Sequence, residues 1–212
     1  AGVQGNGQSE LTRAILNLED HVQGSIKLDD QEILGLTVQD ALRKGIAYIP
    51  ESRELDGLIG SFTIAENLIL DVHDLAPVAS RGQLNSDYIN QNSTKLVKEF
   101  DIRTQSIFEN VSSLSGGNKQ KVVLARELSR DVKLVVASQP TRGLDVGSIE
   151  FVYEKLLSER SANRAILLIS SELDEVLELA DRIAVIYKGE IVGEVGPDVS
   201  REKLGLMMAG IK

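Results

Sequence analysis

The chain has 212 residues, 23 Lys+Arg against 32 Asp+Glu, and a formal net charge of −9, and this length suffices to bury a sizeable core in one domain, residues 1–212. With 42% hydrophobic and 26% charged residues the chain is not disordered, and its acidic balance without a basic tract argues against a nucleic-acid partner. No apolar run approaches the roughly 20 residues that span a bilayer, and the absence of cysteine excludes disulfides, thiolate metal sites and cysteine nucleophiles.

A glycine-rich loop, AGVQGNGQS, opens the chain at Ala1. Such a loop normally follows a β-strand, and no strand precedes it in this sequence, so we interpret the chain as an N-terminally truncated fragment. After the loop, Leu11, Ala14, Ile15 and Leu18 recur at the spacing of a helix with an apolar face.

The next segments predict a hairpin, a strand and then helices. Residues 24–33 are typical of a hairpin that turns at Asp29 and Asp30, and residues 45–50 are typical of a buried strand. Residues 63–70 and 87–100 have helical patterns, with an exposed connection rich in turn residues between them. We therefore expect a helical subdomain over approximately residues 63–130.

The last third of the chain predicts an α/β core. Residues 133–138 and 165–170 are short aliphatic strands separated by a helical stretch, the alternation typical of parallel βαβ units. A second hairpin over residues 182–195, turning at Lys188 and Gly189, precedes a short helix over 201–210.

The glycine-rich loop matches the phosphate-binding pattern GxxxxGK[ST] at every fixed position except that of the lysine, where Gln8 stands. Its glycines let backbone N–H groups turn toward a phosphate, the following helix adds its dipole, and Ser9 is a candidate Mg²⁺ ligand. A charge-assisted hydrogen bond contributes about 1.5–3 kcal/mol, so an amide in place of lysine should weaken phosphate binding by one to two decades. A glycine turn that merely opens a helix is the alternative. The candidate nucleotide-binding residues are Gly2, Gly5, Asn6, Gly7, Gln8, Ser9 and Glu10.

Two further motifs follow in order. Residues 114–120, LSGGNKQ, closely resemble the LSGGQ signature of ABC ATPases, and residues 134–145, LVVASQPTRGLD, align with the Walker B segment and D-loop of that family. With the loop, these motifs make the chain resemble an ABC transporter nucleotide-binding domain over nearly its whole length. Five segments narrow the resemblance to the second, C-terminal half of the double-length ATPase subunits that energise bacterial uptake of simple sugars and nucleosides: GxxGNGQSEL, YIPESR, LSGGNxQK, ASQPTRGLDVG and SSELDEVLELADRIAVIYKGEIVG. Within that group, AxQPTRGLDVG with DRIAVIYKG resembles the nucleoside importers more than the ribose or galactose type.

The resemblance implies a P-loop NTPase fold, with a parallel sheet and a helical signature subdomain, that binds ATP and Mg²⁺. It also implies a head-to-tail dimer with another ABC ATPase half, permease subunits as membrane partners, a solute-binding protein as an indirect partner, and a peripheral position on the cytoplasmic face of the membrane. As a whole subunit, such a protein is an ATP hydrolase.

Four positions depart from the family pattern. At the two positions of Walker B that are normally acidic, this chain has Ser138 and Gln139. Ser138 offers Mg²⁺ only a neutral hydroxyl, and the Gln139 amide cannot accept a proton from water. The switch histidine is replaced by Ser171. The Q-loop position is Glu51, an exchange that the resemblance implies is common in such second halves and that need not mean loss of coupling. Because these losses act on the same transition state, we expect negligible hydrolysis at this loop.

The motif that would serve a partner's nucleotide is intact: Leu114, Ser115, Gly116 and Gly117, with the D-loop residue Asp145. This division suggests a half that binds ATP weakly and completes the competent site of the other half. A non-catalytic dimerisation or regulatory module with no nucleotide of its own is the alternative. A soluble ABC protein of DNA repair or ribosome function would need intact carboxylates and basic surfaces. The acidic run over 172–178 is expected to be a solvated helix face.

Overall fold

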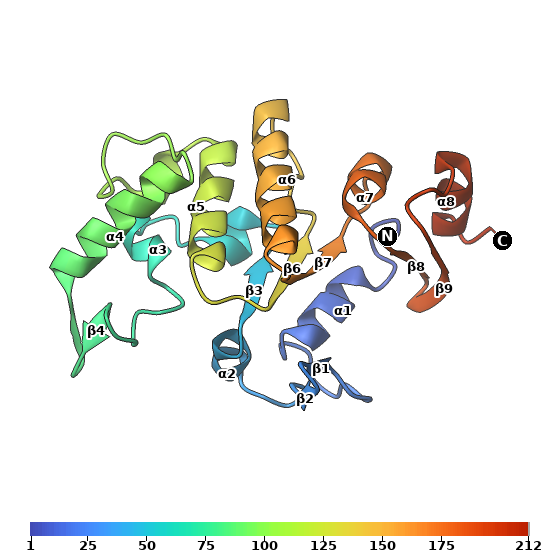
Figure 1. Ribbon diagram of the computed structural model, residues 1–212, viewed down its shortest axis with the longest axis horizontal. Coiled ribbons are helices and arrows are strands. Elements are labelled where there is room, and N and C mark those ends of the chain that lie inside the picture. Colours follow the sequence, from blue (N-terminus) through green and yellow to red (C-terminus); the bar gives the residue numbers. More distant parts are fainter. Residues whose placement is uncertain (212) are drawn as a thin grey trace.

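The computed structural model describes residues 1–211, which form three parallel strands between two layers of helices, with a hairpin to one side (Figure 1). The helices are α1 (Gln8–Ile15), α2 (Val38–Arg43), α3 (Ile64–Leu68), α4 (Ser86–Glu99), α5 (Gly116–Leu128), α6 (Val146–Ser161), α7 (Leu173–Leu179) and α8 (Arg201–Met208), with a π-helical turn at Arg53–Gly57 and a 3₁₀ turn at Val111–Ser113. The strands are β1 (Lys27–Leu28), β2 (Gln31–Glu32), β3 (Ile46–Ile49), β4 (Ala79–Ser80), β5 (Gln83–Leu84), β6 (Leu134–Ser138), β7 (Ala165–Ile169), β8 (Ile183–Tyr187) and β9 (Glu190–Val195).

The central sheet has the order β3-β6-β7, and both strand pairs are parallel. Successive side chains of a strand point to opposite faces. Ala47, Ile49 and Val135 accordingly pack in one core with α5 and α6, whereas Ile46 and Val136 pack in a second core with α1 and α2. Burial on both faces explains why these strands are continuously aliphatic, and it confirms the α/β fold predicted from the sequence.

The structure corrects three details of the predicted elements. Leu11 and Leu18 are 40% and 47% exposed, because the buried face of α1 is formed by Thr12 and Ile15 together with Leu16 beyond its end. The connection between α3 and α4 is not wholly exposed, since it forms the short hairpin β4–β5 and buries Val78. Helix α2, which Thr37 caps by accepting the Asp40 N–H, was not predicted.

The hairpin β8–β9 stands apart from the central sheet and holds the first residue of the chain. The Ala1 amino group donates to the Ala184 carbonyl at 2.6 Å, and Ile186 N–H donates to the Ala1 carbonyl at 2.8 Å. Among the described residues β7 and β8 do not pair, and both line a cleft of about 410 Å³. The phosphate loop is therefore attached to the body of the protein through β8 and α1.

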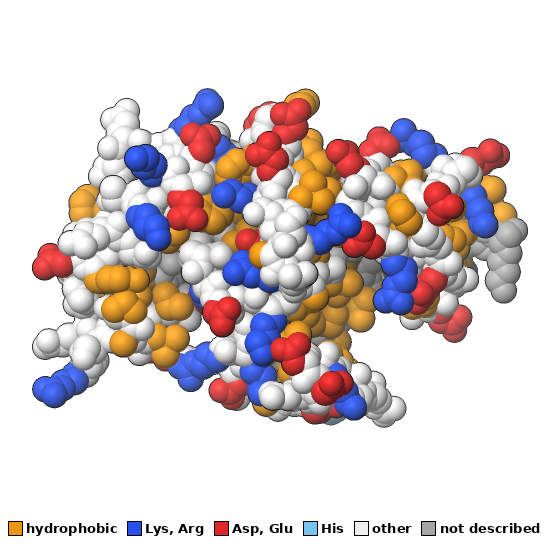
Figure 2. Space-filling view, in the orientation of Figure 1, with side chains coloured by type: hydrophobic (Ala, Val, Ile, Leu, Met, Phe, Trp, Pro, Cys, Tyr) orange, Lys and Arg blue, Asp and Glu red, His pale blue; other side chains and the backbone are white. Residues whose placement is uncertain are grey.

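Charges of both signs are interspersed over the face shown in Figure 2, and apolar side chains are visible between them. In the described part of the chain, no helix combines the length and apolarity that crossing a bilayer requires.

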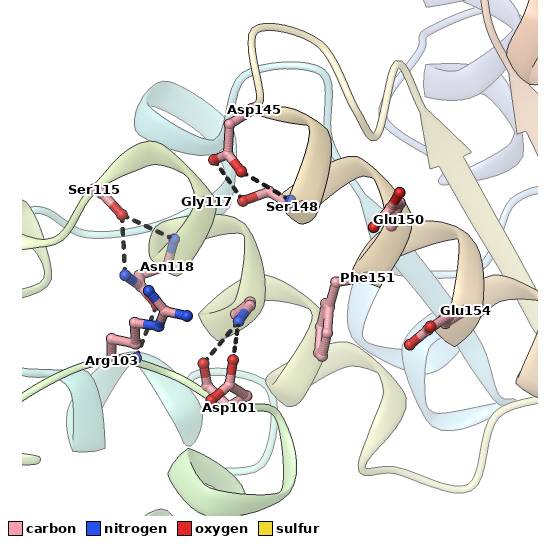
Figure 3. Close-up of a pocket in the computed structure, with 12 residues that line it drawn as sticks. Asp101, Arg103, Ser115, Gly117, Asn118, Asp145, Ser148, Glu150, Phe151 and Glu154 are labelled. Atoms are coloured by element: carbon pink, nitrogen blue, oxygen red, sulfur yellow. Dashed lines mark hydrogen bonds and ion pairs between the residues drawn. The ribbon is translucent and has the colours of Figure 1, made fainter.

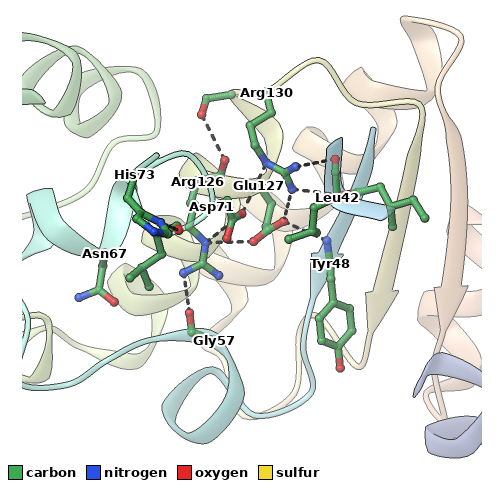
Figure 4. Close-up of polar contacts among 12 residues, drawn as sticks. Leu42, Tyr48, Gly57, Asn67, Asp71, His73, Arg126, Glu127 and Arg130 are labelled. Atoms are coloured by element: carbon green, nitrogen blue, oxygen red, sulfur yellow. Dashed lines mark hydrogen bonds and ion pairs between the residues drawn. The ribbon is translucent and has the colours of Figure 1, made fainter. Parts of the chain in front are cut away.

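A buried ionic network ties α5 to the sheet and to the loop after β3 (Figure 4). Arg126 donates to the Gly57 carbonyl at 2.8 Å and to Glu127 at 3.0 Å. The Glu127 carboxylate also accepts the Tyr48 N–H of β3 at 3.0 Å and a bond from Arg130 at 2.7 Å. Since each of these groups is buried, removing one partner leaves another charge without compensation.

We therefore expect Arg126→Ala to lower the free energy of unfolding by about 3–5 kcal/mol, because it leaves the buried Glu127 carboxylate and the neighbouring Asp71 carboxylate to share Arg130. Arg160→Ala is the matched control, since Arg160 pairs with Asp181 where both side chains are at least half exposed, and such surface pairs contribute about 0–1 kcal/mol. Denaturant unfolding of both variants measures the difference. Equal losses would contradict a structural role for the network.

Candidate functional site

The phosphate-loop candidates form a tight turn at the start of α1. Gly5 and Gly7 have φ angles of 87° and 105°, the left-handed region that favours glycine. Asn6 is pinned between them by the β8–β9 turn: its carbonyl accepts the Gly189 N–H at 2.9 Å and its side-chain oxygen accepts the Lys188 N–H at 2.8 Å. The hairpin turn predicted from the sequence thus fixes the middle of the loop.

Gln8 bonds back onto the loop. Its Oε1 accepts the Asn6 N–H at 3.0 Å, and its Nε2 donates to the Val3 carbonyl at 2.9 Å. A Cβ on Gly2 would lie 2.7 Å from that Nε2, so only glycine fits there. A phosphate would have to displace the Gln8 amide to gain the Asn6 donor, and it would receive no ammonium charge in return.

The residues suggested for Mg²⁺ do not fit a tightly held ion. Ser9 is exposed in the first turn of α1, beside Glu10, and Ser138 is buried at the end of β6. Mg²⁺ in proteins is usually held through carboxylates together with phosphate oxygens, whereas these two side chains are neutral hydroxyls. Within residues 1–211 no group of three or more His, Cys, Asp or Glu side chains is placed to hold a metal.

The two candidate catalytic positions after β6 and β7 are in contact with each other. Gln139 has φ 47°, and its Nε2 donates to Ser171 Oγ at 3.1 Å. Both groups are neutral, and neither accepts a proton from water near neutral pH. The structure brings Gln139 and Ser171 together, and neither side chain can act as a general base.

Glu51 joins the phosphate loop to the loop that precedes α6. Its Oε1 accepts a hydrogen bond from Gln4 Nε2 at 3.0 Å and forms an ion pair with Arg142. Arg53 lies nearby and donates to the Arg142 carbonyl at 3.0 Å. Sequence reasoning missed both arginines, although Arg142 lies inside the PTRGLD motif and Arg53 two residues after Glu51.

The signature residues lie at the start of α5. Ser115 is the N-cap residue and Leu114 is buried just before it. Gly117 faces the start of α6, where a Cβ would lie 2.1 Å from Ser148 Oγ, and a Cβ on Gly116 would lie 3.0 Å from Arg53 Nη2. Close packing against Ser148 therefore requires glycine at position 117, whereas a Cβ at position 116 would meet the movable end of the Arg53 side chain.

Asp145 caps α6 on the other side of this contact. Its two carboxylate oxygens accept the Ser148 N–H at 3.0 Å and the Ser148 hydroxyl at 2.7 Å. The hydroxyl bond, followed by the backbone bond, lowers the pKa of Asp145, so this exposed carboxylate is ionised at neutral pH.

Ser115, Gly117 and Asp145 share one pocket of about 320 Å³ (Figure 3), which we call the signature pocket. Its lining residues are Asp101, Arg103, Ser115, Gly117, Asn118, Lys121, Asp145, Gly147, Ser148, Glu150, Phe151 and Glu154. No residue of the phosphate loop belongs to it. The candidate residues therefore lie in two separate places, the phosphate loop and the signature pocket.

Glu175 corrects the expectation of a solvated acidic face. It is 1% exposed, and its Oε1 accepts the Thr141 hydroxyl at 2.8 Å. Burial raises the pKa of Glu175, and the nearby Glu172 carboxylate adds to the increase. The acidic run therefore holds a buried carboxyl under the PTRGLD loop, where the periodicity of a seven-residue helix gave no signal.

The comparison with protein families matches residues 1–142 to the ABC transporter family. The chain belongs to this family. It is 43% identical over 211 residues, 99% of its length, to the guanosine import ATP-binding protein NupO of Bacillus subtilis, and 43% identical to the nucleoside import ATP-binding protein NupA of Lactococcus lactis. It is 38% identical to the glucose import ATP-binding protein TsgD13 of Haloferax volcanii. The chain spans 41%, 42% and 39% of these three relatives.

Solved structures agree on the fold. A dimeric post-hydrolysis form of the ATP-binding cassette MJ0796, bound to ADP and Pi, matches with a TM-score of 0.77 and 20% identity, over 94% of this chain and 84% of that one. The cassette MJ1267 in its ADP conformation matches with a TM-score of 0.74 and 19% identity, over 98% and 82%. The fold is that of an ABC cassette.

We expect Glu175→Gln to remove a pH-dependent loss of stability. The folded-state pKa of Glu175 is raised, so the folded protein binds the proton more tightly than the unfolded chain, and stability falls as pH rises from the unfolded pKa through the folded one. Glutamine keeps the oxygen that Thr141 bonds and carries no charge. Unfolding curves at several pH values should show a smaller decline for the variant. Parallel curves for both proteins would contradict this account.

We expect Gln8→Lys to tighten Mg-ATP binding by about 10- to 100-fold, because it adds a charge-assisted bond to the phosphates and frees the Asn6 N–H. Gln8→Ala is the control: it also frees that N–H but supplies no cation, and should change the affinity by less than about tenfold. Calorimetric titration measures both variants. Identical affinities for lysine and alanine would show that this loop does not hold phosphate.

Proposed function

We propose that the chain is the degenerate second nucleotide-binding half of an ATPase subunit that couples ATP binding and hydrolysis to solute uptake by a bacterial ABC importer. Residues 1–212 form one ABC ATPase domain, with a helical subdomain over approximately residues 63–130. It works at the cytoplasmic face of the membrane as a peripheral protein, in contact with permease subunits and, through them, with a solute-binding protein.

The observation that carries the proposal is the contrast between two half-sites, the phosphate loop and the signature pocket. The phosphate loop has Gln8 where the family pattern has lysine, and the two acidic positions of Walker B are Ser138 and Gln139. Gln139 and Ser171 form a neutral hydrogen-bonded pair. In the signature pocket, Ser115 caps α5, Gly117 leaves no space beside Ser148, and Asp145 is ionised. A chain that had simply lost function would lose both half-sites alike.

In the proposed dimer the first half holds ATP in its own phosphate loop, and the signature pocket of this chain closes over it from the other side. Ser115 and the N–H groups at the start of α5 would donate to the γ-phosphate, a charge-assisted contact that gains strength as charge shifts during phosphoryl transfer. ATP at this chain's own loop would bind weakly and remain unhydrolysed, with Mg²⁺ weakly held or absent.

The relatives favour a nucleoside as the transported solute. The two at 43% identity are named for guanosine and nucleoside import, whereas the glucose relative is at 38% and a ribose import protein of Rubrobacter xylanophilus is at 33%. Simple sugars remain the alternative solute class. A module that dimerises without binding any nucleotide is the alternative function, and nucleotide titration distinguishes it.

We expect Ser115→Arg to lower uptake and ATPase activity of the transporter by about two orders of magnitude, because the long side chain fills the signature pocket. Ser115 is exposed, so this change leaves the core intact, whereas Gly117→Asp would also push against Ser148 and Asp145. Gln139→Ala is the matched control and should cost less than about tenfold, since it removes no working base. Transport of nucleoside into vesicles measures both. Equal damage from the two variants would show that this half is itself catalytic.

A further inference from the structure

A chain of three hydrogen bonds connects a loop before the signature to the signature serine (Figure 3). The Arg103 N–H donates to Asn118 Oδ1 at 2.8 Å, and Asn118 Nδ2 donates to Ser115 Oγ at 3.0 Å. The Asn118 N–H donates to the same Ser115 Oγ at 3.4 Å. Asn118 therefore approaches the Ser115 oxygen with two donors.

The Arg103 N–H decides which way the Asn118 amide points. A backbone N–H only donates, so it requires the amide oxygen, and the amide nitrogen must then face Ser115. Helix α5 also fixes the position of Arg103 through the two residues before it. Lys121 of α5 donates to the carbonyl and the carboxylate of Asp101 at 2.8 and 2.6 Å, and Ile102 is buried.

This arrangement determines the role of the Ser115 hydroxyl hydrogen. A serine oxygen can accept two hydrogen bonds and donate one, and Asn118 supplies two donors to this oxygen. Within residues 1–211 the structure gives the Ser115 hydroxyl no acceptor. The hydroxyl hydrogen is therefore available to donate into the signature pocket, which Ser115 lines.

We propose that Asn118 is a positioning residue that aims the Ser115 hydroxyl at the phosphate of the nucleotide bound by the partner half. Asn118 acts through Ser115, because its two donors occupy the Ser115 oxygen as an acceptor. The hydroxyl is then already oriented as a donor when the phosphate binds, and it need not reorient in the transition state. The inference rests on the proposed function of the signature pocket.

A double-mutant cycle in the intact transporter tests this role. Ser115→Ala should lower kcat/KM for ATP hydrolysis by about 10- to 100-fold, the range of a charge-assisted bond. Asn118→Ala should lower it by about 3- to 10-fold when Ser115 is present and by less than about twofold in the Ser115→Ala background. The loss should fall on kcat rather than on KM, because the contact strengthens as charge moves to the transferred phosphoryl group.

Two controls separate positioning from a general loss of structure. Asn118→Gln keeps both amide functions and should restore most of the activity. Asn110→Ala makes the same chemical change at an exposed asparagine whose side chain caps nothing, and should leave kcat unchanged. Thermal melting of all variants shows whether the protein is intact.

The outcomes distinguish this inference from the proposed function. If Asn118→Ala costs the same with and without the Ser115 hydroxyl, Asn118 does not act through Ser115 and the inference is overturned. If Ser115→Ala is fully active while Ser115→Arg is inactive, the pocket is used but its hydroxyl is not, and only the inference fails. If Ser115→Arg is fully active, the proposed function fails as well.

Discussion

The parallel pairing of β3, β6 and β7 is the constraint on which the candidate site depends. Parallel strands end at the same edge of a sheet. Because Ile49 pairs with Ala137 and Ser138 with Ile169, the residues that follow the three strands emerge together. Glu51, Gln139 and Ser171 are those residues, and their chemistry is interpretable only because the register places them side by side.

Much of this arrangement could be predicted from the sequence. The aliphatic strands and the helices between them have strong patterns, and the LSGG and PTRGLD strings identify the positions where chemistry would occur. What could not be predicted depends on contacts between segments distant in the chain. The sequence does not show that Glu127 accepts a hydrogen bond from the Tyr48 N–H, nor that the buried Glu175 carboxyl accepts one from Thr141. Short elements such as α2 and α7 also have too few turns for their periodicity to identify a buried face.

Three residues that depart from the family pattern are uncharged and hydrogen-bonded: Gln8 in the phosphate loop, and Gln139 and Ser171 after β6 and β7. Gln139 and Ser171 still meet across the ends of β6 and β7, and Gln8 still reaches the backbone of the loop. A buried unpaired charge would be costly here, whereas a neutral hydrogen-bonded pair is compatible with the low dielectric between strand ends. Neutral residues at these positions are therefore compatible with a stable cassette, and they offer no group that would activate water or neutralise a phosphate.

In the proposed dimer the signature pocket has the opposite character, because its polar groups would face a phosphate that the partner half holds. Within the described part of the chain the Ser115 hydroxyl has no acceptor, and the first N–H groups of α5 leave a partial positive charge at the same end. The pocket is lined by four carboxylates, Asp101, Asp145, Glu150 and Glu154, against two cations, Arg103 and Lys121, and Lys121 is already paired with Asp101. This excess of negative charge disfavours a free anion. A phosphate held in place by another subunit overcomes that repulsion through its own binding contacts, whereas a free phosphate has none. The electrostatics of the pocket thus favour an anion delivered by a partner over one captured from solution.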